Sequence, residues 1–338
     1  MEYAFLLYPH ANARYRASLK TLAEAELALL LRALGLQASA TWRTLGGGDW
    51  LCFEADDFAR DAWRLLCRHS AAYVLAIRQG DALCPLDADR PAYVGEDLAA
   101  LLKYKGKTNE MFTELLINAA LASGAFALQG DEPLRLLDPL CGRGTSLFLA
   151  LRRGWHSAGI ERDKADVREL NQFLARYLTY HHMKHKKEEN TLTVAGRLGA
   201  RQWRYDLADT PQHYKAGDTR SLCVALGDTR DAAALWGAAH FHLLAADLPY
   251  GVQHAAQNGG KPQSLQTLLR DALPAWREAL LPGGAAALAF NTYTTKREDL
   301  AAWMEQAGFA VCRGGPYEAM AHWVEQAVNR DVLVGVRA

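Results

Sequence analysis

The sequence lacks several features that would place it in a specialised class of protein. Its 338 residues carry 38 basic and 38 acidic side chains, so there is no net charge to favour nonspecific coating of nucleic acid. Six scattered cysteines form no C-x-x-C pair, which argues against a disulfide scaffold and favours free thiols. No apolar run approaches the length of a membrane span, and the N-terminus lacks the layout of a signal peptide. We therefore expect a cytoplasmic protein with no membrane partner.

The first 95 residues alternate between strand and helix patterns. Residues 2–8, 39–44, 50–54 and 73–77 are predicted strands, and residues 11–34 and 56–68 are predicted helices. The order β-α-β-β-α-β is typical of a ferredoxin-like α+β domain. Residues 81–95 are polar and contain proline, which predicts a linker. We therefore place a first domain at residues 1–95, as a candidate RNA-binding unit.

Residues 96–338 show strands that alternate with helices, which predicts a mainly parallel sheet with crossover helices. An insertion at about residues 164–220 contains a predicted helix at 165–182, a charged stretch and a hairpin. A late edge strand is expected at 332–336. The other predicted strands are residues 134–137, 158–161, 221–226, 242–246 and 285–290.

The strongest local signal is an apolar strand that ends in an acid and a glycine loop, L-L-D-P-L-C-G-R-G-T-S at residues 136–146. Gly142 and Gly144 would let the backbone approach a ligand closely. The loop is not the G-x-G-x-x-G form that cradles a pyrophosphate, and Asp138 suits a positively charged group instead. An ordinary turn between a strand and a helix is the alternative interpretation.

Two further acids follow the next predicted strands. Glu161 lies about twenty residues beyond the glycines, where a nucleotide-binding βαβ unit places a carboxylate for ribose hydroxyls. Asp228, in G-D-T-R at residues 227–230, is a candidate acceptor for an adenine amino group. A plain loop aspartate is the alternative for Asp228.

The fourth motif is A-D-L-P-Y-G at residues 246–251, which follows an apolar run. An exocyclic amine on a base is a poor nucleophile because its lone pair is delocalised into the ring. The Asp247 carboxylate and the Leu248 carbonyl, held by the rigid Pro249, would accept its two N–H bonds. Tyr250 would stack on an extruded base, and catalysis would consist mainly of positioning for in-line attack. A simple Pro-Tyr-Gly turn is the alternative.

Together these motifs resemble the S-adenosylmethionine-dependent exocyclic-amino methyltransferases of the D/N-P-P-Y type, over residues 103–291. The D-L-P-Y-G motif and residues 50–77 are most similar to the THUMP-associated tRNA guanosine N2-methyltransferases. The resemblance implies a Rossmann-like sheet, S-adenosyl-L-methionine as cofactor, and RNA, in particular guanine N2 of tRNA, as substrate. DNA adenine N6 or cytosine N4, and a protein glutamine amide, are the alternative acceptors. The sequence departs from the family at Leu248, which replaces a proline, and at Arg143, which replaces a small residue.

The resemblance also implies which residues form the site. The stretch K-G-K-T-N-E-M-F-T at residues 105–113 is similar to an additional cofactor segment of the family, in which Thr108 and Phe112 or Thr113 flank the cofactor. The implied catalytic residues are Asp247, Leu248, Pro249 and Tyr250. The implied cofactor residues are Thr108, Phe112, Thr113, Asp138, Pro139, Cys141, Gly142, Gly144, Thr145, Glu161, Arg162, Asp228 and Thr229.

Basic residues and an aromatic residue alternate in the insertion, which suits contact with nucleic acid. A solvated helix end is an equally good interpretation, because Glu188 and Glu189 follow the basic stretch. His181 and His185 have the spacing of a metal pair, but no nearby cysteine or carboxylate pattern completes the set, so we expect no metal. The basic and aromatic residues are the stretch H-H-M-K-H-K-K at 181–187, then Arg197, Arg201, Trp203 and Arg204.

Two functions from other classes remain as alternatives. A nicotinamide-dependent oxidoreductase would share the βαβ unit and the ribose carboxylate, but it would need a G-x-G-x-x-G loop. A catalytically silent RNA-binding protein with this fold would be expected to lose Asp247 or the glycine loop, and both are present. Cofactor binding separates the methyltransferase from both alternatives.

Overall fold

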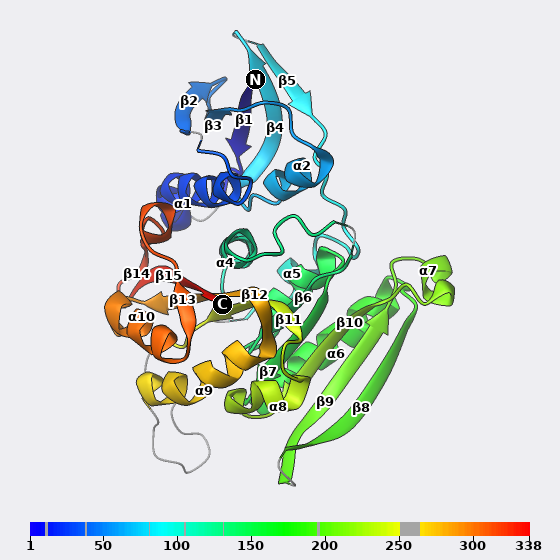
Figure 1. The fold of residues 1–338 in the computed structure, drawn as a ribbon. Helices are drawn as coiled ribbons and strands as arrows, with labels where there is room; N and C mark the ends of the chain where they lie inside the picture. The colour runs from blue at the N-terminus through cyan, green and yellow to red at the C-terminus, as the bar shows by residue number, and fades with distance from the viewer. Residues whose placement is uncertain are drawn as a thin grey trace.

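The computed structural model contains two β-sheets with helices packed against them (Figure 1). It describes residues 1–10, 13–37, 39–80, 82–104, 106–130, 132–194, 197–250 and 264–338. Within this part of the chain, no helix is both long enough and apolar enough to cross a membrane.

The smaller sheet comes from the N-terminal part of the chain and has the antiparallel order β2-β3-β1-β4-β5. The predicted ferredoxin-like order β-α-β-β-α-β is confirmed over its first four strands. The linker prediction was wrong for residues 82–86, which form β5. The free edge of β4 offers unpaired backbone groups that a following extended segment can satisfy. The elements are β1 (Glu2–Leu7), α1 (Ala13–Ala33), β2 (Thr41–Leu45), β3 (Gly48–Glu54), α2 (Arg60–Cys67), β4 (Ala72–Gln79) and β5 (Ala82–Leu86).

The larger sheet has the order β13-β15-β12-β11-β6-β7-β10-β9-β8, with β14 paired to β15. Adjacent strands are parallel from β12 through β11, β6 and β7 to β10, which confirms the predicted α/β sheet. The strands are β6 (Arg135–Asp138), β7 (His156–Glu161), β8 (His185–Val194), β9 (Arg197–Leu207), β10 (Arg220–Leu226), β11 (Phe241–Asp247), β12 (Leu280–Asn291), β13 (Phe309–Val311), β14 (His322–Glu325) and β15 (Val328–Arg337).

The edge-strand prediction for residues 332–336 was wrong. These residues lie in β15, which pairs antiparallel with β12 on one side and with β13 on the other. The strand is therefore interior, in agreement with its continuous apolar run and with the burial of Val332, Leu333 and Val334.

Helices cover both faces of the larger sheet, so consecutive strand residues enter different cores. Leu136 and Leu243 belong to the core shared with α4 and α5, whereas Leu137 and Leu244 belong to the core shared with α9 and α10. The helices are α3 (Leu98–Leu101), α4 (Glu110–Ser123), α5 (Thr145–Arg152), α6 (Lys164–Tyr180), α7 (Pro211–Ala216), α8 (Ala232–Trp236), α9 (Leu265–Ala279) and α10 (Arg297–Gln306).

The predicted insertion begins later than expected. α6 is the crossover helix between β7 and β10, and the added part is the hairpin of β8 and β9 followed by α7. α6 ends at Tyr180, and His182 has a positive φ of 52°, which right-handed helical backbone does not adopt. Residues 185–187 of the basic stretch therefore start a strand rather than end a helix.

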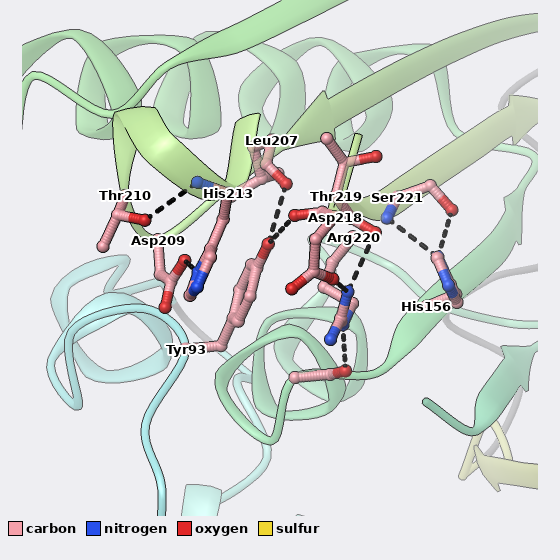
Figure 2. A network of polar contacts seen from close by, with 11 residues as sticks. Tyr93, His156, Leu207, Asp209, Thr210, His213, Asp218, Thr219, Arg220 and Ser221 are labelled. Atoms are coloured by element: carbon pink, nitrogen blue, oxygen red, sulfur yellow. Dashed lines mark hydrogen bonds and ion pairs between the residues drawn. The ribbon is translucent and has the colours of Figure 1, made fainter. Parts of the chain in front are cut away.

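The base of the hairpin is fixed to the rest of the sheet by a polar network (Figure 2). The Tyr93 hydroxyl lies 3.2 Å from the carbonyl oxygens of Leu207 and Asp218. The Arg220 guanidinium lies 4.9 Å from the centroid of the Tyr93 ring, and its Nε donates to the Gly154 carbonyl at 2.6 Å. This network holds the added hairpin in place as an extension of the sheet.

The two sheets are joined through α1 and α4, which pack against each other. The Asn118 Nδ2 of α4 donates to the buried Glu26 carboxylate of α1 at 2.6 Å, and to the Arg68 carbonyl at 2.6 Å. A buried carboxylate needs such donors to offset its lost hydration. The N-terminal unit is thereby fixed against the helix that begins within the predicted cofactor segment. The division of the chain into domains at residue 95 stays a prediction.

Candidate active site

Four acids follow four neighbouring parallel strands of the larger sheet. Asp138, Glu161 and Asp247 are the last residues of β6, β7 and β11, and Asp228 comes two residues after β10. The strand order β11-β6-β7-β10 therefore places them along one carboxyl edge. This is the edge at which open α/β sheets bind their ligands. A row of carboxylates favours a ligand that carries positive charge.

Asp138 is the most strongly perturbed of these acids. Its Oδ1 accepts from the Leu140 backbone N–H at 3.0 Å, and its Oδ2 accepts from the Ser146 hydroxyl. Burial raises the pKa of Asp138 to about 7 in spite of these hydrogen bonds, and the charges of Asp247 and Glu161 add to the rise. A buried carboxyl surrounded by other acids is a site that a cation would stabilise.

The two glycines of the loop adopt positive φ angles. Gly142 has a φ of +51° and a Cβ there would meet nothing within 4 Å, so this backbone faces open space. Gly144 has a φ of +86° and caps α5, and a Cβ there would lie 2.6 Å from Leu170 Cδ1. Glycine adopts such positive φ angles without strain. The open space at Gly142 leaves room for a ligand against the backbone.

Arg143, which departs from the family pattern, lies outside this open space. Its Nε donates to Asp166 on α6 at 2.7 Å and it also pairs with Glu169. The guanidinium lies 4.6 Å from the centroid of the Tyr104 ring, whose hydroxyl lies 3.5 Å from Thr145 Oγ1. Arg143 thus ties the segment before α4 to the glycine loop.

Glu161 and Asp228 are held differently. Glu161 accepts from the backbone N–H groups of Gly142 at 2.9 Å and of Arg162 at 2.6 Å, and burial raises its pKa. Asp228 forms a two-point ion pair with Arg230, and the hydrogen bond from Arg230 lowers its pKa. Glu161 is therefore fixed against the glycine loop, whereas Asp228 would have to share its carboxylate between Arg230 and a ligand.

The Asp247 carboxylate lies at the centre of a compact polar cluster. Its Oδ2 accepts from the Thr108 hydroxyl at 2.5 Å, and its Oδ1 accepts from the Tyr250 hydroxyl. Arg330 of β15 places Nη2 at 3.6 Å from Oδ2, and its Nε donates to the Tyr250 hydroxyl at 2.5 Å. Thr108 and Tyr250, two residues implied by the resemblance, thus meet the same carboxylate.

Arg330 is almost fully buried, with 6% of its surface exposed. Its guanidinium lies 4.5 Å from the centroid of the Phe112 ring and 5.2 Å from that of Tyr250. Burial and the charge of Asp247 raise the pKa of Tyr250 well above its ordinary range, so its hydroxyl stays a donor to Asp247. The cation and the two rings hold Asp247 in a defined orientation.

Leu248 stands where the resembled methyltransferases have a proline, and its backbone takes part in the sheet. Its backbone N–H donates to the Ala289 carbonyl of β12 at 2.8 Å, which extends the ladder between β11 and β12 by one bond. A proline has no N–H and would lose this bond. The side chain of Leu248 is buried in the core beside α9.

The remaining implied residues are distributed around the edge. Phe112 is fully buried beneath Arg330, and the Thr113 hydroxyl donates to the Asn109 carbonyl at 3.1 Å. Thr229 accepts from the Trp276 indole at 3.0 Å, which is a packing role. Their contacts to a cofactor stay predictions, as do those of the buried Pro139, Cys141 and Thr145 and of the exposed Arg162.

Some residues named from the sequence lie outside the part of the chain that the structure describes. These are Gly251, Lys105 and the side chain of Arg197. Among the residues that are described, no group of three or more His, Cys, Asp or Glu side chains could hold a metal ion.

Sequence reasoning missed Arg330 and Tyr104. Arg330 is 80 positions from Tyr250 in the chain and lies in a strand that has no motif around it, so no local signal marks it. Tyr104 immediately precedes the predicted cofactor segment, and an aromatic residue beside that segment is the one clue that was present.

Comparison with known proteins gives similarity in structure only. No family model and no curated protein sequence matches the chain. TrmN from Thermus thermophilus aligns at a TM-score of 0.41 and 18% identity, over 91% of this chain and 64% of TrmN, so the chain spans less than two thirds of that protein. The rRNA methyltransferase aviRa from Streptomyces viridochromogenes aligns at 0.37 and 16% identity, over 72% of this chain and 92% of aviRa. The magnesium protoporphyrin IX methyltransferase of Synechocystis PCC 6803 aligns at a TM-score of 0.37 and 14% identity, over 72% of this chain and 90% of that methyltransferase. Similarity of this kind does not assign an activity.

Proposed function

We propose that this chain is an S-adenosylmethionine-dependent methyltransferase that acts on an exocyclic amino group of a nucleic-acid base, with guanine N2 of RNA, in particular tRNA, as the leading acceptor. The observation that carries the proposal is the Asp247 carboxylate. It lies at the carboxyl edge beside Asp138, and two hydroxyl groups donate to its two oxygens.

The row of acids fits the cofactor in charge. S-adenosylmethionine carries an ammonium and a sulfonium, and when bound it supplies an electrophilic methyl group. Asp138 would face the ammonium, Glu161 the ribose hydroxyls and Asp228 the adenine amino group. The open space over Gly142 leaves room for a ligand against the backbone. These assignments rest on the order of the acids along the sheet and on the motif resemblance.

Asp247 has the contacts that an amino acceptor would use. The Thr108 and Tyr250 hydroxyls each donate a hydrogen bond to one oxygen of the Asp247 carboxylate. The N–H groups of a base amine would donate to the same two oxygens. A hydrogen bond from such an N–H to Asp247 would favour a tetrahedral nitrogen, whose lone pair is no longer delocalised into the ring. The nitrogen would then form a bond to the methyl group that the bound cofactor supplies as the cofactor's sulfur leaves it, and the amine would lose its proton afterwards. Arg330 holds the carboxylate in place throughout.

Transfer of tritium from labelled S-adenosylmethionine tests the proposal. Total tRNA, ribosomal RNA and genomic DNA serve as separate acceptors, with nucleoside analysis of any labelled pool. Wild-type protein is compared with Asp247→Ala and with Asp299→Ala, a control at an exposed acid of α10. We expect N2-methylguanosine in RNA, a loss on the order of a hundredfold or more in Asp247→Ala, and full activity in the control.

The other outcomes are also informative. Label in DNA alone would keep the chemistry and move the acceptor to adenine N6 or cytosine N4. Cofactor binding without transfer to any nucleic acid would favour a protein glutamine amide. Absence of cofactor binding would overturn the proposal, and would favour an oxidoreductase or a silent RNA-binding protein.

A further inference from the structure

A groove of about 600 Å³ lies between α6 and the added hairpin, separate from the cluster around Asp247. In Figure 1, β8 and β9 extend the larger sheet beyond α6, and the groove is lined by residues from α6, both hairpin strands and the end of β10. Its lining residues include five cations and one large aromatic residue: Lys164, Arg168, Arg176, Lys187, Arg201 and Trp203.

One wall of the groove is a stripe along α6. Lys164, Arg168, Gln172 and Arg176 recur every four residues and therefore lie on one face of the helix, each about 6 Å above the last. The four side chains are exposed. Three of the four are cations, and exposed cations along one helix face suit contact with an extended polyanion.

The other wall is one face of the hairpin. Tyr205 points toward α6, because its hydroxyl lies 3.0 Å from Asn171 Oδ1. Side chains alternate along a strand, so Trp203 and Arg201 share this face with Tyr205. Lys187 pairs in register with Tyr205 and lies 5.4 Å from the centroid of its ring.

The groove keeps most of its positive charge. Glu189 on the same face pairs with Arg201 and accepts from the Trp203 indole at 3.0 Å, which offsets one cation. In the described part of the chain, Lys164, Arg168 and Lys187 form no ion pair. In a chain with no net charge, several uncompensated cations along one groove indicate a polyanionic ligand.

One border of the groove lies at the carboxyl edge of the sheet, because Leu226 ends β10 and pairs in register with Glu161. Lys164 lies three residues after Glu161, and Leu226, at the other border, lies two residues before Asp228. Asp247 ends β11, three strands from β10, which is about 14 Å at the usual spacing of strands. A nucleic-acid strand lying in the groove would therefore reach the carboxyl edge within a few nucleotides.

We infer that this groove binds a single-stranded segment of RNA next to the target base. The α6 stripe and Lys187 contact consecutive phosphates, and Trp203 stacks on an unpaired base, with the Arg201 guanidinium 5.1 Å from the centroid of its ring. A target base must leave its stack before its amino group can enter a pocket, so the flanking strand is locally unpaired. The inference rests on the proposed function for the class of ligand, but binding is measurable without catalysis.

Fluorescence anisotropy of a labelled single-stranded RNA of about 12 nucleotides tests it. The double variant Arg168→Ala/Lys187→Ala should bind about tenfold more weakly at low salt, and the slope of log affinity against log salt should fall by about 1.4, for two lost phosphate contacts. Trp203→Ala should weaken binding about fivefold or more, and Trp203→Phe should recover part of this loss.

The hairpin provides a matched control. Lys186 and Arg204 lie on its opposite face and pair with Glu188 and Asp206. Lys186→Ala/Arg204→Ala removes the same charge and should bind RNA as the wild type does. Equal weakening by both double variants, unchanged binding in the groove variant, or equally strong competition by polyglutamate would overturn the inference. Weaker RNA binding in the groove variant alone would support the inference, even if no methyl transfer were found. The test of the groove is therefore independent of the test of the proposed function.

Discussion

Replacing Asp138 by asparagine tests the electrostatics of the carboxyl edge. Burial raises the pKa of this carboxyl from an ordinary value of 3.8 to about 7. A shift of about three units corresponds to about 4 kcal/mol, as an upper bound, at about 1.4 kcal/mol per unit. Asparagine removes the charge and keeps both contacts, because its oxygen still accepts from the Leu140 N–H and its amide donates to the Ser146 hydroxyl.

The sign of the pH dependence follows from the direction of the shift. A raised folded-state pKa means that the favourable contribution of the protonated carboxyl is complete below pH 4 and is lost as the pH rises toward 7. Asp138→Asn should therefore match the wild type near pH 4, exceed it by about 2 kcal/mol at pH 5, and by up to about 4 kcal/mol at pH 8.

Urea denaturation across this pH range measures the difference in the free energy of unfolding between the two proteins. Asp163→Asn is the control, because this exposed N-cap of α6 keeps its capping contacts as asparagine. A difference that does not grow with pH, or a less stable Asp138→Asn at pH 8, would refute the reasoning. The same variant should bind S-adenosylmethionine more weakly, since the neutral amide attracts the ammonium less.

Two further predictions concern the residues that hold the site together. Arg330→Met should lower kcat by about tenfold or more and leave cofactor affinity nearly unchanged, because the Asp247 carboxylate loses the cation that holds it. Arg330→Lys keeps the positive charge and should restore part of kcat. If lysine restores none of it, the role of Arg330 is purely structural. Gly144→Ala should lower the free energy of unfolding by roughly 1–3 kcal/mol, since its φ is +86° and Leu170 lies 2.6 Å from the new Cβ. Urea denaturation measures this loss, and Gly217→Ala, at a φ of +79° with open space around it, measures the backbone part alone. An equal loss in both variants would show that Leu170 gives way.

Much of the candidate site was predictable because its signals are local. A strand that ends in an acid and a glycine loop is a short stretch of sequence, and so is D-L-P-Y. The alternation of strands and helices fixes a parallel order in which such stretches meet at one edge. The sequence therefore placed Asp138, Glu161 and Asp247 at the ends of neighbouring strands, where the structure has them, while their roles stay predictions.

The predictions that failed depended on neighbours far away in the chain. Residues 82–86 lie in a longer polar passage and contain proline, and pairing with the free edge of β4 makes them a strand. The end of the 332–336 stretch is interior because β13 pairs with Gly335 and Val336 on the side away from β12, and the apolar run does not specify this partner. Strand pairing is a relation between two segments, so the pattern of one segment leaves it open.

The sequence by itself determined the α/β class, the order of the motifs and the row of acids, because each follows from local periodicity and from turns. Only the tertiary structure decided that Arg330 holds Asp247 and Tyr250 and that Leu248 donates to β12. It also decided that cations of α6 and the hairpin line one groove. These contacts join segments that are distant in the chain, and only packing of the whole sheet brings their side chains together.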